Sequence, residues 1–327
     1  MKKRAKTFLI GSGMTAAAMA LVGSARHGIA DYLVRVALCR DVPPHPIRAE
    51  RQIAGSCIDP KMLALVEQAR MQLTAHPHQI VRIQGRDGTA LLAHWMPVSN
   101  AKRVVIAMHG WRSSWEHDFG MICDFLRDNG CSVLYPEQRG QGSSGGEYMG
   151  FGLTERYDCL NWIEWVNENT GKNLPVYLCG ISMGASTVLM AGGLELPSNV
   201  HGIIADCGYT SPVDIWKHVA ENHLHLSYGI CGAPACRMAR RKIHMDMDAE
   251  TCPQALSRCR VPVLFIHGTD DRFVPVEMTY ENYKACSAPK RLLIVPGAEH
   301  GMSYLVDRMG YETAVQTFWA DFDGEIP

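Results

Sequence analysis

The sequence predicts an α/β protein with a mostly parallel, doubly wound sheet, an antiparallel hairpin at its start and an inserted cap. Two observations carry this prediction. After two short strand-like runs, β-type segments alternate with helical segments almost to the end of the chain, as in parallel sheets with helices on both faces. One long stretch, about 209–259, interrupts the alternation, and long ordered insertions in compact domains are often lids.

Length and composition are those of an ordinary globular protein. A chain of 327 residues can bury a sizeable core in one large domain. The formal net charge is −1 and no basic stripe is present, so we expect no nucleic-acid partner. The chain has neither a phosphate-binding Gly-x-x-x-x-Gly-Lys loop nor a dinucleotide fingerprint, so we expect no cofactor. The oligomeric state leaves no readable mark in the sequence.

Residues 1–30 are predicted to be a signal peptide or an N-terminal membrane anchor. Lysines and an arginine crowd the first six positions, and Thr7–Ala25 is free of charge. Gly23-Ser-Ala25 is a candidate cleavage site, although the run is weakly hydrophobic and barely long enough to span a bilayer. The basic flank favours a chain that is anchored in the cell membrane or secreted, with its remainder outside. A buried N-terminal helix and a cytoplasmic location are the alternatives.

The cysteine pattern does not favour an exported protein. The chain has twelve cysteines, scattered and without the spacing of a disulfide framework. Cys131, Cys159 and Cys179 fall within predicted strands or a predicted helix, where a free cysteine behaves as a small hydrophobe. This pattern favours a reducing or anaerobic setting, and an anchored protein of an anaerobe would satisfy both observations.

A helical extension is expected over 31–78, with a helical patch at Pro60–Leu73, and the main domain over 79–327. Gln79–Gln84 and Thr89–Met96 are joined by a short glycine-containing connector, which is typical of a hairpin. Further strands are predicted near Arg103–Met108, Cys131–Tyr135, Pro175–Cys179, Val200–Ala205, Val261–Ile266 and Arg291–Val295. Helices are predicted near His117–Asp128, Leu153–Asn169, Met183–Glu195, Val276–Ala285 and Tyr311–Phe322.

The predicted cap is rich in histidine and cysteine, which raises the question of a metal site. It contains His218, His223, His225, Cys231, Cys236, His244, Cys252 and Cys259. Zinc sites pair their ligands at short spacings, as in Cys-x-x-Cys. No such pair is present, so we expect no metal.

The chain contains two Gly-x-Ser-x-Gly motifs, and their surroundings separate them. In Gly180-Ile-Ser182-Met-Gly184 a strand-like run precedes the serine and a helical run follows. This is the layout of a nucleophile elbow, a sharp strand-to-helix turn that exposes the serine hydroxyl. The other serine, Ser144, lies in a glycine-rich loop with no helix behind it, so we interpret it as a loop residue.

A serine nucleophile needs a histidine base and an acid that orients the histidine. In this kind of fold the three follow one another as serine, acid and histidine at strand ends. His300 follows the last predicted strand in a glycine-flanked loop. The acid candidates are Asp270 and Asp271 after one strand and Asp206 after another, the latter also interpretable as a loop-bracing aspartate.

Two main-chain N–H groups should stabilise the developing oxyanion. One is that of Met183, directly after the serine. The other comes from the loop His109-Gly-Trp111, where we expect Trp111 to be the donor. His109 is then a structural residue that shapes this loop.

These motifs resemble the α/β-hydrolase superfamily over about Gln79–Phe322. The matching segments are His109-Gly-Trp111, Gln138-Arg-Gly-Gln-Gly-Ser143, Gly180–Gly184, His267-Gly-Thr-Asp-Asp271-Arg-Phe-Val-Pro275 and Gly297-Ala-Glu-His300. The chain is most similar to bacterial members with an N-terminal membrane segment, described as serine aminopeptidase-like or prolyl-oligopeptidase-like. The resemblance implies that the acid is Asp271. Glu137 departs from the aspartate of many relatives, but it is not a triad position.

The resulting expectation is a serine hydrolase that cleaves carboxylic esters through an acyl-enzyme, with Ser182, His300 and Asp271 as its triad. The expected partner is a small-molecule acyl substrate. Aminopeptidase, thioesterase and acyltransferase activities are alternatives on the same triad. An aminopeptidase would need a carboxylate for the substrate's amino group, and the cap offers Glu221, Asp246, Asp248 and Glu250. A non-catalytic, membrane-anchored binding protein on the same fold is the alternative from another class.

Overall fold

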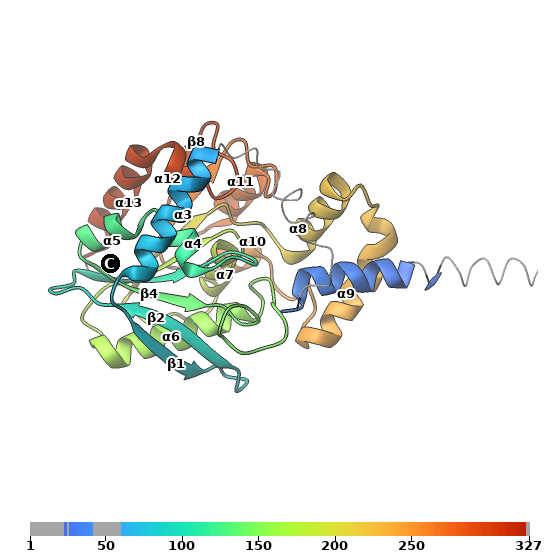
Figure 1. Ribbon diagram of the computed structural model, residues 1–327, viewed down its shortest axis with the longest axis horizontal. Helices are drawn as coiled ribbons and strands as arrows, with labels where there is room; N and C mark the ends of the chain where they lie inside the picture. The colour runs from blue at the N-terminus through green and yellow to red at the C-terminus, as the bar shows by residue number, and fades with distance from the viewer. Residues whose placement is uncertain (1–22, 25, 42–59, 325–327) are drawn as a thin grey trace, which may run out of the picture.

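An eight-stranded sheet with the order β1-β2-β4-β3-β5-β6-β7-β8 runs through the centre of the computed structural model, which describes residues 23–24, 26–41 and 60–324 (Figure 1). The strands are β1 (Gln79–Gln84), β2 (Ala90–Met96), β3 (Arg103–Met108), β4 (Cys131–Glu137), β5 (Val176–Ile181), β6 (Val200–Asp206), β7 (Val263–Gly268) and β8 (Lys290–Val295). β2 pairs antiparallel with β1 and with β4, whereas all pairs from β4 to β8 are parallel. The predicted mostly parallel sheet with a starting hairpin is confirmed.

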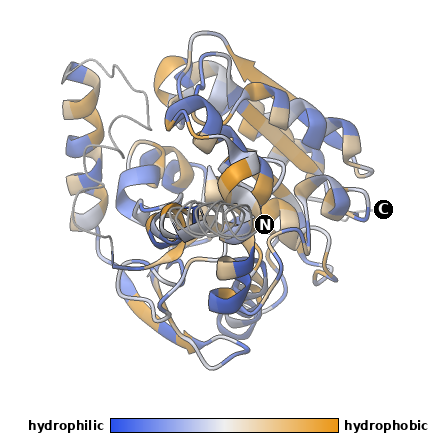
Figure 2. Ribbon diagram, turned by 90° about the vertical axis from the view of Figure 1, so that its right-hand side faces the viewer, coloured by the Kyte–Doolittle hydropathy of each residue, from blue (hydrophilic) through white to orange (hydrophobic). Residues whose placement is uncertain are grey.

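Helices cover both faces of this sheet. Along β3, Val104 and Ile106 belong to one core while Val105 and Ala107 belong to the other, as the period of two requires. The first core contains α6 (Glu155–Thr170), α7 (Met183–Ala191) and α10 (Cys252–Leu256), with α11 (Val276–Ala285) packed against it; the second contains α5 (Cys123–Asp128) and α13 (Arg308–Phe322). In Figure 2 the strands are mainly hydrophobic, and the outer helices carry both hydrophobic and hydrophilic residues. The sheet is therefore doubly wound.

The helix predicted over His117–Asp128 is wrong as a single element. The structure has α4 (Trp115–Phe119) and α5, separated by a turn over 120–122 that begins at Gly120. A β-carbon on Gly120 would lie within 3.0 Å of backbone atoms of Ala69 and Arg70 in α3 (Pro60–Ala75). The chain thus turns at a point where its backbone is in close contact with α3. The remaining predicted helices are confirmed to within a few residues at each end.

The segment between β6 and β7 contains α8 (Pro212–His218), the short π-helix η1 (Val219–His223), α9 (Tyr228–Ile243) and α10. α10 packs on the body, where the Cys252 thiol contacts the Ser186 carbonyl. α8 and α9 project to one side of the sheet (Figure 1). This projecting part is the cap over the carboxyl ends of the central strands.

A helix over residues 26–38 lies against α9 (Figure 1), and Arg26 Nε donates to Ile230 O at 3.0 Å. Its buried side is the stripe Ala30, Val34 and Leu38, all fully buried. Within the described ranges, no helix is long and apolar enough to cross a membrane. The predicted leader residues 1–22 and 25 lie outside the described residues, as do 42–59 of the predicted extension. Every cysteine of the described part is a free thiol.

Candidate active site

Ser182 occupies the sharp turn between β5 and α7, with φ 57° and ψ −119°. A non-glycine residue held in such a conformation carries strain of about 1–3 kcal/mol, which the surrounding structure must offset. A β-carbon on Gly184 would overlap the carbonyl group of Met108, and one on Gly180 would overlap the Gly184 carbonyl. The two glycines of the motif are therefore required by backbone contacts, and the turn has the geometry of the predicted elbow.

The structure brings Ser182, His300 and Asp271 together from the ends of three strands. The Ser182 hydroxyl lies 2.9 Å from His300 Nε2, and His300 Nδ1 lies 2.7 Å from Asp271 Oδ2. With the Asp271 carboxylate accepting, Nδ1 carries the proton and Nε2 has its lone pair toward the serine. This arrangement can take a proton from the Ser182 hydroxyl.

Asp271 is held by a full set of hydrogen-bond donors. Its Oδ1 accepts from the backbone N–H groups of Phe273 and Val274 at 2.9 and 2.8 Å. Its Oδ2 also lies 3.1 Å from His267 Nε2, which in turn lies 2.8 Å from Val274 O. Two acceptors at Nε2 place the His267 proton there, so the Thr279 hydroxyl donates to His267 Nδ1 at 2.7 Å.

These contacts set the charges of the pair. Burial alone would raise the pKa of Asp271, but His300 and His267 lower it well below its usual range. Burial alone would lower the pKa of His300, but the Asp271 carboxylate raises it well above 6.5. The His300 side chain is 20 % exposed, whereas that of Asp271 is fully buried. The carboxylate therefore stays ionised and stabilises an imidazolium at His300.

The competing candidates lie elsewhere. Asp270 is exposed and its carboxylate accepts from the neighbouring Thr269 hydroxyl. Asp206 is buried and accepts from the Ser303 hydroxyl at 3.2 Å, and burial raises its pKa to about 6. Ser144 is buried in its loop, where its hydroxyl contacts the backbone of β2 and β4. None of these three has a hydrogen bond to the His300 ring among the described residues.

The loop after β3 carries the predicted oxyanion donor Trp111. His109 is buried, burial lowers its pKa, and its Nε2 accepts from Gln138 N at 3.1 Å. It is neutral and shapes the loop, as predicted. Asp118 also holds the loop, because its Oδ2 accepts from Gly110 N at 2.6 Å. No motif in the sequence indicates this aspartate.

Two cavities meet at Ser182. The first is lined by Trp111, Met183, the cap and the helix over residues 26–38, and none of its described lining residues is charged. The second contains His300, Gly301 and Met302 together with Asp118 and Asp206. Its empty volume is about 1550 Å³, against about 770 Å³ for the first, counting space open to solvent. Ser182 thus lies between an apolar chamber without charged residues and a larger one on the histidine side whose lining includes charged side chains.

Among the described residues, two groups of three could hold a metal ion, and neither belongs to the cap. His76, Cys123 and Asp124 form one, and Cys207, Asp271 and His300 form the other, with ligand atoms within 4.8 Å. Cys207 follows β6 directly and touches the His300 ring, and burial raises the pKa of its thiol to about 11. A metal there would occupy the ring that the hydrogen-bond chain needs. Its position after a strand end was the only sequence signal for Cys207.

Comparison with known proteins shows the family to which this chain belongs. Residues 99–226 match the family model described as "Serine aminopeptidase, S33". The uncharacterised protein YqkD of Bacillus subtilis is 31% identical over 218 residues, which cover 65% of this chain and 70% of that protein. The chain belongs to the α/β-hydrolase superfamily, a superfamily of hydrolases.

Solved structures share the fold at lower identity. The esterase Pf2001 of Pyrococcus furiosus has a TM-score of 0.61 at 22% identity, over 77% of this chain and 95% of that one. A puromycin-hydrolyzing peptidase of Mycobacterium tuberculosis has a TM-score of 0.59 at 16% identity, over 76% of this chain and 40% of that one. An esterase and a peptidase therefore have the same scaffold, and the choice of substrate depends on the site itself.

Proposed function

We propose that this protein is a serine hydrolase that cleaves carboxylic esters through an acyl-enzyme on Ser182. One observation carries the proposal. A hydrogen-bond chain runs from the buried Asp271 carboxylate through His300 to Ser182, and Ser182 lies where a cavity without charged residues meets one whose lining includes charged side chains. That is the arrangement a serine needs to attack a carbonyl group while the two halves of the substrate occupy separate spaces.

The reaction proceeds in two acyl transfers. His300 Nε2 takes the Ser182 proton as the hydroxyl oxygen attacks the carbonyl carbon, and the tetrahedral intermediate carries the negative charge on the former carbonyl oxygen. The intermediate collapses as the C–O bond to the alcohol breaks, and His300 gives its proton to the leaving oxygen. Water, deprotonated by the same nitrogen, then attacks the acyl-enzyme; the bond to the serine oxygen breaks, His300 returns the proton to that oxygen, and the acid leaves.

The oxyanion is assigned to the backbone N–H groups of Trp111 and Met183. Met183 is the first residue of α7, so its N–H has no acceptor one turn earlier and lies at the positive end of the helix dipole. Trp111 lines both cavities beside Ser182. Two such donors contribute most when they are fixed before the charge develops.

The cavities favour an ester over an aminoacyl substrate. His300 protonates the leaving group, so the leaving group belongs in the cavity that His300 lines and the acyl part in the one without charged residues. The acyl part of an aminopeptidase substrate carries an ammonium group, which would meet no carboxylate among the described lining residues. Of the cap candidates, Glu250 is paired with Arg156 and Arg258, and neither it nor Glu221, Asp246 or Asp248 lines either cavity.

Covalent labelling tests the nucleophile. A fluorophosphonate should label the purified protein and should fail to label Ser182→Ala, while Ser144→Ala, at the second motif, should be labelled like the wild type. Equal labelling of Ser182→Ala would overturn the assignment, and an unlabelled wild type would favour a binding protein. p-Nitrophenyl esters compared with aminoacyl p-nitroanilides test the substrate class, and turnover of the anilides alone would exclude the ester proposal.

We also propose that the N-terminal segment places the protein in the cell membrane or outside it. Its basic flank and uncharged run support this proposal. Cell fractionation tests the location, and sequencing of the mature N-terminus tests cleavage after Ala25. Recovery of the full-length chain in the soluble cytoplasm would contradict the proposal.

A further inference from the structure

The helix over residues 26–38 forms one wall of the apolar cavity beside Ser182. We propose that this helix and the cap together make the cavity a binding site for one straight aliphatic acyl chain, and that Leu33 limits the length of that chain. The inference rests on the proposed function, because it assigns the acyl half of the ester to this cavity.

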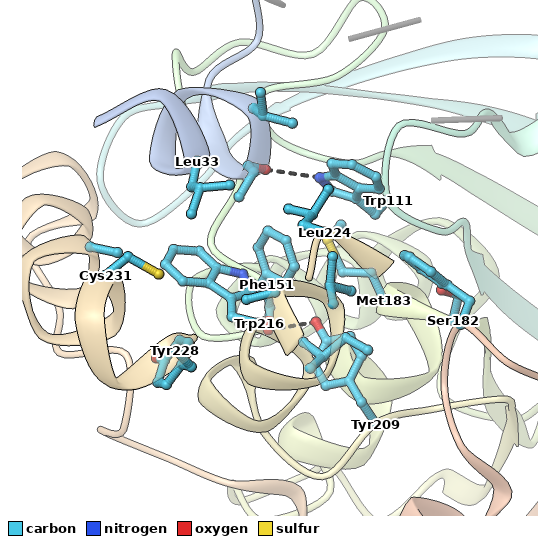
Figure 3. Close-up of a pocket in the computed structure, with 17 residues that line it drawn as sticks. Leu33, Trp111, Phe151, Ser182, Met183, Tyr209, Trp216, Leu224, Tyr228 and Cys231 are labelled. Atoms are coloured by element: carbon cyan, nitrogen blue, oxygen red, sulfur yellow. Dashed lines mark hydrogen bonds between the residues drawn. The ribbon is translucent and has the colours of Figure 1, made fainter. Parts of the chain in front are cut away.

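The lining residues come from two opposed elements. The N-terminal helix contributes Leu33, Val36 and Ala37. The cap contributes Trp216, Leu224, Tyr228 and Cys231. In Figure 3 Ser182 lies at one end of the group, whereas Leu33, Tyr228 and Cys231 lie at the other. An acyl chain attached to Ser182 therefore extends toward Leu33.

The polar atoms of the lining are nearly all engaged within the protein. Tyr209 donates its hydroxyl to Phe151 O at 3.0 Å, and Trp111 Nε1 donates to Ala37 O at 2.8 Å (Figure 3). Among the side chains that line this cavity, the indole N–H of Trp216 is the one buried group without a hydrogen-bond partner in the described part of the protein. Such a wall offers a polar ligand almost no hydrogen bonds, while it removes each methylene of an aliphatic chain from water.

The helix is fixed to the catalytic loop. Besides the bond from Trp111, the Arg112 guanidinium donates to Val36 O at 2.7 Å and to Cys39 O at 2.7 Å. These carbonyls lie at the C-terminal end of the helix, where the helix dipole favours a positively charged group. The wall of the cavity and the loop that carries the assigned oxyanion donor Trp111 therefore hold each other in place.

The glycine-rich loop of the second serine motif completes the attachment. Met149 N donates to Leu38 O at 2.8 Å, and the Arg40 guanidinium donates to Gly142 O at 2.8 Å and also to Ser144 O. The loop that contains Ser144 thus anchors the C-terminal end of the helix over residues 26–38. Together with the buried stripe along the helix, these bonds make it a permanent part of the site.

The test is the dependence of kcat/KM on acyl length in full-length protein, with p-nitrophenyl esters from acetate to dodecanoate. In the wild type, each methylene that fits should raise kcat/KM by about fourfold until the chain reaches Leu33. Leu33→Trp should move the optimum to shorter chains and lower kcat/KM at the wild-type optimum by about tenfold or more. Acetate is too short to reach Leu33, so the ratio of kcat/KM for each longer ester to that for acetate isolates the effect of chain length, and circular dichroism shows whether the variant is folded.

Tyr32→Trp is the matched control, because Tyr32 is exposed and does not line the cavity; it should leave the profile unchanged. Leu33→Ala should move the optimum to longer acyl chains. Superimposable profiles for Leu33→Trp and wild type would overturn the inference. If no ester is hydrolysed, the proposed function fails, and calorimetric binding of free dodecanoate then decides: weaker binding by Leu33→Trp supports the chain site, and equal or absent binding overturns it.

Discussion

Replacing Asp271 with asparagine changes one atom at the centre of the hydrogen-bond chain. The asparagine oxygen can keep the two backbone N–H donors of Phe273 and Val274. Its NH₂ group then faces His300 Nδ1 at the place of Oδ2, and two N–H groups cannot point at each other. The imidazole of His300 must therefore turn to the tautomer with its proton on Nε2, and it loses the lone pair that Ser182 needs.

The size of the effect follows from the distance and the burial. Unit charges between the 2.7 Å of the hydrogen bond and ~4 Å attract by roughly 4–6 kcal/mol at an effective dielectric constant of ~20. Loss of that attraction in the transition state corresponds to about 10³- to 10⁴-fold in kcat, and the wrong tautomer alone costs roughly 10⁴-fold in a serine triad. We expect kcat for Asp271→Asn to fall by at least about 10³-fold, with KM within about threefold.

The assay is steady-state ester hydrolysis across pH. His300 must be neutral to accept a proton, and Asp271 raises its pKa, so kcat/KM of the wild type falls as the pH drops through that raised pKa. Without the carboxylate the pKa of His300 falls, and the acid limb of Asp271→Asn should move to lower pH. Asp270→Asn, one residue away and exposed, should match the wild type. An Asp271→Asn variant with more than about a tenth of wild-type kcat would refute the reasoning.

Two further predictions concern stability. Arg156→Ala should lower the free energy of unfolding by about 3 kcal/mol in urea denaturation, because it removes the buried partner of Glu250. Arg258→Ala removes an exposed partner of the same carboxylate and should lower it by under about 1 kcal/mol. Equal losses in the two variants would contradict this prediction. Gly184→Ala should lose at least about 3 kcal/mol, because its β-carbon overlaps a β3 carbonyl, whereas Gly229→Ala should be folded like the wild type by circular dichroism.

The strands of this fold were predictable because buried runs and turn residues are local signals. The predicted bounds Gln79–Gln84 and Arg103–Met108 are those of β1 and β3. β4 continues two residues beyond the predicted Tyr135, because Pro136 sits in the antiparallel pair with Ala93, and a proline argues against a paired strand in the sequence. Candidates for serine, acid and histidine could be found for the same reason, since each follows a local strand signal, but the choice of Asp271 over Asp270 and Asp206 came from the resemblance to a family.

The supporting residues were not predictable, because their roles depend on contacts distant in the chain. His267 directly follows the predicted strand Val261–Ile266, and nothing local shows that Thr279 and Asp271 complete its hydrogen bonds. Asp118 lay in a predicted helix, and only the fold brings it to the loop after β3. The helix over residues 26–38 has a readable stripe, but the stripe does not say which surface it covers.

The helix over residues 26–38 bears both on where the protein is located and on catalysis. It continues across residue 30, where the predicted leader ends, and Ala37 O accepts from the Trp111 side chain. Cleavage after Ala25 would leave the chain beginning at Arg26, with every contact of the helix retained. A recombinant chain begun at residue 42 or 79 would keep Ser182, His300 and Asp271 but lose the cavity wall and the hydrogen-bond partners of the Trp111 and Arg112 side chains in the helix. Inactivity of such a shortened chain would therefore be evidence about the helix, and only a chain that includes it can test the triad.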